Sequence, residues 1–241
     1  MYDPIETQIS FDLLKELITE CRKQNIKVEI IGGWATYFYV NESYRRAFGK
    51  DYMGSRDIDI CFDHSKEEEF LKLIKDLGYI PNGMPFRWEK IYNRETKKFL
   101  TEEEAEKEQI FNLIKIFLDI FCDGKTEKLK SWNLPSLRNR KTMVVSSFEV
   151  TDVDTLIDLK CHALFERDKA DKENKDACDL YSLIRYSNQK ITLTPLLKKA
   201  IEKILNRSDL LYTISQHVLL DAGKQNIVQY ILGLRLQNKL T

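Results

Sequence analysis

The sequence has few of the residues that hold disulfide-rich or zinc-binding domains together. Its five cysteines are odd in number, widely scattered and never arranged as C-x-x-C, and its three histidines show no mutual spacing that suggests a ligand set or a base. This pattern argues against a disulfide framework and a zinc site, and it favours buried thiols in a reducing compartment. Chemistry in this chain is therefore expected from other side chains.

The sequence also lacks an excess of charge of either sign and a long apolar run. Lysine plus arginine and aspartate plus glutamate are both 38 of 241 residues, so the whole molecule exerts no long-range attraction on nucleic acid. No uncharged stretch approaches the length that spans a bilayer, and the first ten residues, MYDPIETQIS, have no basic or apolar region of a signal peptide. We expect a cytoplasmic protein with no membrane contact, which would meet a polynucleotide only through a local patch.

Hydrophobic periodicity divides the chain near residue 150. Before this point, apolar and β-branched runs predict strands that alternate with helices, within 26–33, 57–63, 86–92, 111–121 and 142–150. Ser10 is a candidate N-cap of the first helix, and an S-x-x-E capping box at 65–68 is expected to begin another. After it, the pattern predicts only helices, at 153–166, 172–186 and 194–206, with two more before the C-terminus. No repeat or Pro/Gly linker separates the halves. We therefore predict an α+β domain with a mixed sheet and flanking helices over 1–150, and an all-helical domain over 151–241 that packs directly on it.

Two aspartates alternate with isoleucine in the stretch GSRDIDICF, residues 54–62. Because alternate residues of a strand point to one side, Asp57 and Asp59 share a face, and the apolar residues share the other. Two like charges at this spacing repel each other, and Mg²⁺, which is commonly held by one or two carboxylates, would compensate them. A solvent-facing edge strand whose aspartates pair with lysines explains the pattern equally well.

Three further aspartates, a pair and a single residue, are interpreted differently. Asp152 and Asp154 form a second D-x-D pair directly before an amphipathic helix, so we assign them to capping of its N-terminus. Asp119 instead stands alone in the apolar strand LIKIFLDIF. A buried carboxylate without a partner is costly, so a cation must lie near it. The candidates are Lys115, on the same face of the strand, and a metal ion shared with the first D-x-D pair.

A glycine pair, Gly32 and Gly33, ends one predicted strand and begins a helix that contains no breaker. Such a turn permits positive φ and close approach of another group, and a helix N-terminus offers N–H groups to an anion. Strand-Gly-Gly-helix turns also arise for steric reasons alone. Combined with the acidic strand, this turn suggests a phosphate held between backbone amides and a metal ion.

Taken in order, these motifs resemble the polymerase-beta-type nucleotidyltransferase superfamily, and most closely its AbiEii toxin-like branch. The resemblance rests on the Gly32-Gly33 turn, the motif Ser55-x-Asp57-Ile58-Asp59, and the single Asp119 on a later strand. In the helical half it extends to Lys160, Arg167, Lys175, Asp176 and Asp179. Trp34, which follows the glycines where small or hydroxyl residues are common, and the charged insertion at 93–109 depart from the family pattern.

The resemblance implies an enzyme that moves a nucleoside monophosphate from a nucleoside triphosphate to an acceptor hydroxyl, with pyrophosphate as the leaving group. It implies that Asp57, Asp59 and Asp119 are catalytic residues that bind one or two Mg²⁺ ions. In an alternative role, Asp119 accepts the proton of the acceptor hydroxyl. It implies nucleotide binding by Gly32, Gly33, Ser55, Lys160, Arg167, Lys175, Asp176 and Asp179. Surface salt bridges between the helices would account for the last five residues as well.

The acceptor remains open between RNA and a small molecule. Segment 124–141 has six basic residues and one acid, a local net charge of +5, and contains Trp132, which suits contact with a single-stranded RNA such as a tRNA 3′ end. A solvated loop that balances the acidic run at 102–108 explains the same charges. A toxin-like enzyme would add an antitoxin protein as a partner. An antibiotic-type nucleotidyltransferase, a nucleotide-binding module without catalysis, and surface ion pairs without a ligand are the alternatives.

Overall fold

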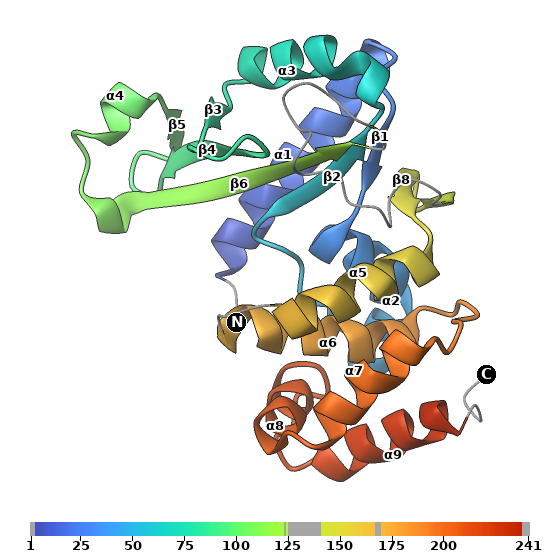
Figure 1. The fold of residues 1–241 in the computed structure, drawn as a ribbon. Coiled ribbons are helices and arrows are strands. Elements are labelled where there is room, and N and C mark those ends of the chain that lie inside the picture. The colour runs from blue at the N-terminus through green and yellow to red at the C-terminus, as the bar shows by residue number, and fades with distance from the viewer. Residues whose placement is uncertain (1–2, 123, 125–140, 167–169, 238–241) are drawn as a thin grey trace.

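The computed structural model describes residues 3–122, 124, 141–166 and 170–237, and it places a mixed sheet beside a group of helices (Figure 1). The strands of the described residues are β1 (Val28–Ile30), β2 (Ile58–Phe62), β3 (Ile80–Pro81), β4 (Arg87–Asn93), β5 (Lys98–Leu100), β6 (Leu113–Cys122), β7 (Thr142–Val145) and β8 (Phe148–Thr151). They form one sheet in the order β3-β4-β6-β2-β1-β8-β7, with β5 paired to β4. The predicted α+β fold with a mixed sheet is confirmed.

The helices of the described ranges are α1 (Pro4–Lys23), α2 (Gly32–Phe48), α3 (Glu67–Asp76), α4 (Glu102–Ala105), α5 (Val153–Glu166), α6 (Ala170–Tyr186), α7 (Pro195–Leu205), α8 (Ser208–His217) and α9 (Gln225–Leu236). In the view of Figure 1, α3 lies above the sheet and helices α5 to α9 lie below it. The predicted all-helical C-terminal region is confirmed. No helix within the described ranges is both long enough and apolar enough to cross a membrane.

Strand pairing in the centre of the sheet determines where the polar side chains meet. β2 and β6 are parallel, and Asp59 stands opposite Asp119. β6 and β4 are antiparallel, and Asp119 stands opposite Arg87. Because residues in register on neighbouring strands project from the same face, the three strands place an arginine and two aspartates in one row across the sheet.

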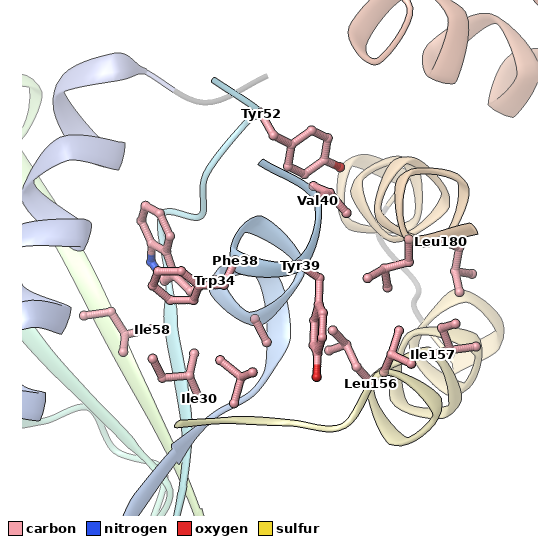
Figure 2. Packing of buried hydrophobic residues seen from close by; sticks show 14 of the residues in the cluster. Ile30, Trp34, Phe38, Tyr39, Val40, Tyr52, Ile58, Leu156, Ile157 and Leu180 are labelled. Carbon is pink, nitrogen blue, oxygen red and sulfur yellow. The ribbon is translucent and has the colours of Figure 1, made fainter. Parts of the chain in front are cut away.

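One apolar core connects the sheet with the C-terminal helices, and α2 lies at its centre (Figure 2). Figure 2 shows side chains of α2 between Ile30 and Ile58 of the sheet on one side and Leu156 and Leu180 of the helices on the other. The last strand ends at Thr151, where the predicted boundary lies. The division into domains 1–150 and 151–241 stays a prediction, because a shared core does not test it.

Three local predictions are wrong. The first helix begins at Pro4 with Asp3 as its N-cap, and Ser10 is a buried acceptor for Trp34 Nε1 at 3.0 Å rather than a cap. The expected capping box at 65–68 is replaced by a 3-10 turn that Asp63 caps before α3 begins. Residues 142–150 form a hairpin of β7 and β8 rather than one strand, because the two serines between them adopt positive φ.

Candidate active site

A pocket of about 90 Å³ opens where the sheet, the start of α2 and the helices α5 and α6 meet. It is lined by nine residues that the sequence singled out, namely Gly33, Ser55, Asp57, Asp59, Asp119, Lys160, Lys175, Asp176 and Asp179. Two more lining residues, Arg87 and Lys172, were not predicted. Arg167 and residues 125–140 lie outside the described part of the chain, so the structure says nothing of the predicted roles of Arg167 and the basic segment.

The glycine pair is required by the close approach of two side chains. Gly32 has φ of +66°, and a Cβ atom there would lie 2.1 Å from Oδ2 of Asp59. A Cβ atom at Gly33 would lie 2.7 Å from Oγ of Ser55. The N-cap residue of α2, Ile31, has no side chain that could accept hydrogen bonds from the first turn. The turn therefore brings backbone N–H groups and a carboxylate together in a space that a side chain would fill.

The acids of the sheet meet an arginine that the sequence analysis did not assign. Arg87 donates from Nε and Nη2 to the two carboxylate oxygens of Asp119, at 2.7 and 2.6 Å. Asp57 directly precedes β2 and receives a longer contact from Arg56 Nε, at 3.3 Å. The guanidinium of Arg87 also lies over the ring of Phe117, 5.0 Å from its centroid. One face of the sheet thus carries three carboxylates beside a fixed cation.

Of the two candidate partners of Asp119, Lys115 is wrong. Lys115 Nζ instead contacts Oε1 of Glu89 on the neighbouring strand, at 2.7 Å. Residues four apart on a strand share a face but stand about 13 Å apart, so Lys115 is too distant to pair with Asp119. The antiparallel neighbour β4 supplies the partner at contact distance.

The electrostatics of Arg87 reflect this crowding of acids. Its side chain is 22% exposed and that of Asp119 is 10% exposed, so solvent screens the pair only in part. The hydrogen bonds that Arg87 donates to Asp119, together with the negative charges of Asp119, Asp57 and Asp59, raise the pKa of Arg87 above its ordinary value. The guanidinium therefore stays charged at neutral pH.

The donor set of the pocket suits Mg²⁺ in part. In the described ranges, no three histidine, cysteine, aspartate or glutamate side chains are grouped as a ready metal site. Asp57 and Asp59 still offer carboxylate oxygens to one pocket, and a Mg²⁺ ion commonly takes one or two carboxylates and completes its shell with water and phosphate. At Asp119 the guanidinium of Arg87 occupies the place of a cation.

The helical wall of the pocket is a buried network of ion pairs. Lys160 Nζ contacts Asp176 at 2.9 Å and Asp179 at 2.7 Å, and Lys175 also pairs with Asp179. Tyr52 donates from its hydroxyl to Asp179 at 2.8 Å. Burial opposes the charge on Lys160, but the two carboxylates raise its pKa above the ordinary value. These lysines and aspartates thus pair with one another, but the pairs are buried in the pocket wall and are not the surface salt bridges of the alternative. Their part in nucleotide binding stays a prediction.

Lys172 differs from the other two lysines of this wall. It is partly exposed, lines the pocket, and forms no ion pair with any residue that the structure describes. A cation of this kind keeps its charge available to an anionic ligand, because no carboxylate among the described side chains neutralises it. Lys172 was not predicted because it is one of several lysines at the charged start of a helix.

Other predicted positions have simple explanations. Trp34, the departure from the family pattern, is 2% exposed and packs against Phe11 at a ring distance of 4.9 Å. It does not line the pocket that holds Asp57 and Asp59. Asp152 caps α5 as predicted and accepts from the N–H of Thr155 at 3.1 Å. Asp154 does not cap this helix but accepts from the N–H of Thr192 at 2.9 Å.

Comparisons with known proteins find likeness in structure only. No protein-family model matches this sequence, and no curated protein matches it. The solved structure of JHP933 from Helicobacter pylori is similar with a TM-score of 0.50 and 15% identity, over 99% of this chain and 95% of that one. An antigenic nucleotidyltransferase-like protein from Paracoccidioides brasiliensis has a TM-score of 0.46 and 17% identity, over 88% and 93% of the two chains. The antibiotic-resistance factor ANT(2'')-Ia has a TM-score of 0.43 and 11% identity, over 96% and 95%.

At these identities the comparison concerns the fold alone. The likeness to JHP933 spans nearly the whole of both chains, so the α+β arrangement with helices after the sheet is a known architecture. Function has to be inferred from the pocket itself.

Proposed function

We propose that this protein is a nucleotidyltransferase that moves a nucleoside monophosphate from a nucleoside triphosphate to an acceptor hydroxyl. The observation that carries the proposal is the composition of one pocket, where carboxylates of the sheet, the N-terminus of α2 and lysines of two helices converge. A triphosphate needs backbone or lysine donors for its oxygens, and its reaction at the α-phosphorus needs the negative charge to be neutralised. The pocket offers both.

Each part of the pocket has a role in this proposal. The N–H groups at Gly32 and Gly33 and the hydroxyl of Ser55 would donate to phosphate oxygens, and Lys172 would add a cation at the pocket wall. Asp57 and Asp59 would hold Mg²⁺. When bound, this ion neutralises charge on the phosphates as the acceptor oxygen attacks and pyrophosphate leaves.

Asp119 and the buried lysines complete the assignment. Asp119 would either join the metal ligands or accept the proton of the acceptor hydroxyl, and in both roles one of its oxygens must give up a hydrogen bond from Arg87. Lys160 and Lys175 neutralise Asp176 and Asp179, so we assign them to holding the helical wall in place beside the phosphates. Arg167 keeps its predicted role as a phosphate contact.

RNA is the acceptor that we propose first, because segment 124–141 is strongly basic and follows β6, the strand that carries Asp119. A toxin-like role with an antitoxin partner, as in the AbiEii-like branch, belongs to this version of the proposal. A small-molecule acceptor is the second candidate. It is favoured by a pocket of about 460 Å³, lined by Phe11, Trp34 and Tyr37. Gly54 of this pocket directly precedes Ser55 of the first one.

Incubation with each labelled nucleoside triphosphate and Mg²⁺ tests the proposal. Total RNA, cell protein and a panel of aminoglycosides serve as acceptors, and the recipient of the label is identified. Asp57→Asn should abolish labelling, whereas Lys115→Met, which breaks an ion pair away from the pocket, should retain it. No label on any acceptor, together with no triphosphate binding by calorimetry, would refute nucleotidyl transfer. Label on an aminoglycoside alone would put the small-molecule acceptor first.

A further inference from the structure

We infer that Arg87 is a positioning residue that competes with the divalent cation for Asp119. In the resting protein it holds this carboxylate, and it releases the carboxylate when a triphosphate enters the pocket and offers phosphate oxygens to the guanidinium. The inference rests on the proposed function and adds to it a residue that neither the sequence motifs nor the family resemblance assigns.

The first step concerns the oxygens of Asp119. Each of its two carboxylate oxygens accepts a hydrogen bond from Arg87, at 2.7 and 2.6 Å. A metal ion that bound the same carboxylate would stand beside a full positive charge, and like charges at such a distance repel strongly in a half-buried site. Asp119 therefore contributes little to cation binding while the pair is intact.

The second step concerns the alternative partner of Arg87. Arginine presents a planar fork of donors that matches carboxylate and phosphate oxygens alike. Arg87 lines the same pocket as Gly33, Ser55 and Lys172, where we place the triphosphate. The guanidinium can thus exchange the carboxylate of Asp119 for a phosphate group without leaving the pocket. Its positive charge is balanced by an anion in both states.

The third step concerns how Arg87 is held. It begins β4, and the N–H of Ile120 donates to the carbonyl of Phe86 at 2.8 Å, so the backbone pairing with β6 continues past this position. The ring of Phe117 supports the guanidinium. Because the backbone is anchored, only the side chain has to move in the exchange.

Another ion pair between the same two strands provides a matched control. Lys115 and Glu89 also join β6 and β4, at 2.7 Å, but neither residue lines the pocket. Lys115→Met therefore removes a cation from this part of the sheet without touching the pocket. Arg87→Met removes the cation that competes with the metal ion.

Binding of Mn²⁺, measured from the paramagnetic signal of the free ion in the absence of nucleotide, tests the inference. Arg87→Met should bind Mn²⁺ at least about tenfold more tightly than the parent, the lower end of the effects that ligand-shell changes have on metal affinity. The gain should vanish in Arg87→Met/Asp119→Asn, because the third carboxylate is then missing. Lys115→Met should bind Mn²⁺ like the parent, and Arg87→Lys should fall between the parent and Arg87→Met.

Thermal melts with and without Mn²⁺ separate this role from a structural one. Arg87→Met should melt below the parent without Mn²⁺ and regain more stability from Mn²⁺ than the parent does, since the ion then replaces the lost cation. Unchanged Mn²⁺ affinity in both Arg87→Met and Arg87→Gln, or an Arg87→Met melt that Mn²⁺ does not raise, would overturn the inference. Failure of the parent to bind Mn²⁺ even with a triphosphate would instead overturn the proposed function.

Discussion

Replacement of Gly32 by alanine should damage the pocket far more than replacement of an equivalent glycine at the other end of the same helix. Gly32 and Gly49 flank α2 and have nearly equal φ angles of +66° and +69°. A Cβ atom at Gly49 meets nothing within 4 Å, whereas at Gly32 it would lie 2.1 Å from the carboxylate of Asp59. The two variants therefore share the backbone strain, and only one of them adds a collision with a predicted metal ligand.

The expected magnitudes follow from these two contributions. A left-handed backbone costs a non-glycine residue about 1–2 kcal/mol, so Gly49→Ala should lose about that much free energy of unfolding. Overpacking adds about 1–3 kcal/mol, so Gly32→Ala should lose about 2–5 kcal/mol in total. Because Asp59 must move aside, Gly32→Ala should also lose triphosphate binding in Mg²⁺, which Gly49→Ala should keep.

Urea unfolding of both variants and the parent measures the first effect, and titration with a fluorescent triphosphate analogue in Mg²⁺ measures the second. Stability should be compared without Mg²⁺, so that a loss of ion binding does not enter the unfolding free energy. The reasoning fails if Gly32→Ala is no less stable than Gly49→Ala, or if it binds the triphosphate as tightly as the parent.

Three other outcomes are expected. Asp57→Asn should abolish transfer and leave the melting temperature without Mg²⁺ equal to or above that of the parent, because one of several clustered negative charges is removed; a marked loss of stability would contradict this. Lys160→Met should cost about 3–5 kcal/mol by leaving buried carboxylates without a partner, whereas Lys172→Met, at a partly exposed position, should change stability by less than about 0.5 kcal/mol and weaken triphosphate binding in a filter assay. Burial raises the pKa of Asp179, but the charges of Lys160 and Lys175 outweigh burial and lower it below the ordinary value. The ionised carboxylate therefore contributes its full stability above about pH 4, and this contribution is lost as the pH falls through the lower pKa of the native state. Acid titration followed by circular dichroism should show a shallower pH dependence of stability for Asp179→Asn.

The sequence predicted the acids and glycines of the pocket because the signals for them are local. The two-residue period of a strand places Asp57 and Asp59 on one side, and a lone acid in an apolar strand marks Asp119 as a residue in need of a cation. The structure brings these residues into one pocket. That they hold Mg²⁺ and carry out transfer stays a prediction.

Arg87 was missed because its contact depends on strand pairing. Asp119 and Arg87 are 32 residues apart in sequence and meet only through the antiparallel register of β4 and β6. Local periodicity does not contain this register. A signal was nevertheless available, since the predicted strand FRWEKIY carries an arginine, and a buried acid on another strand requires a cation. The hairpin at 142–151 was missed for a related reason, because serines rarely occupy both central positions of a tight turn.

The register of β6 also limits which insertions and deletions this gene can tolerate. Asp119 stands between Leu118 and Ile120, both fully buried, and opposite Asp59 on one side and Arg87 on the other. Loss of one codon within the strand would turn the carboxylate into the apolar core and present a leucine or isoleucine to the pocket. The same loss in the exposed stretch before β6, at 106–110, would leave every pairing of the strand intact. Length variation among natural variants should therefore be confined to such connecting segments, while the ten residues of β6 keep a constant length.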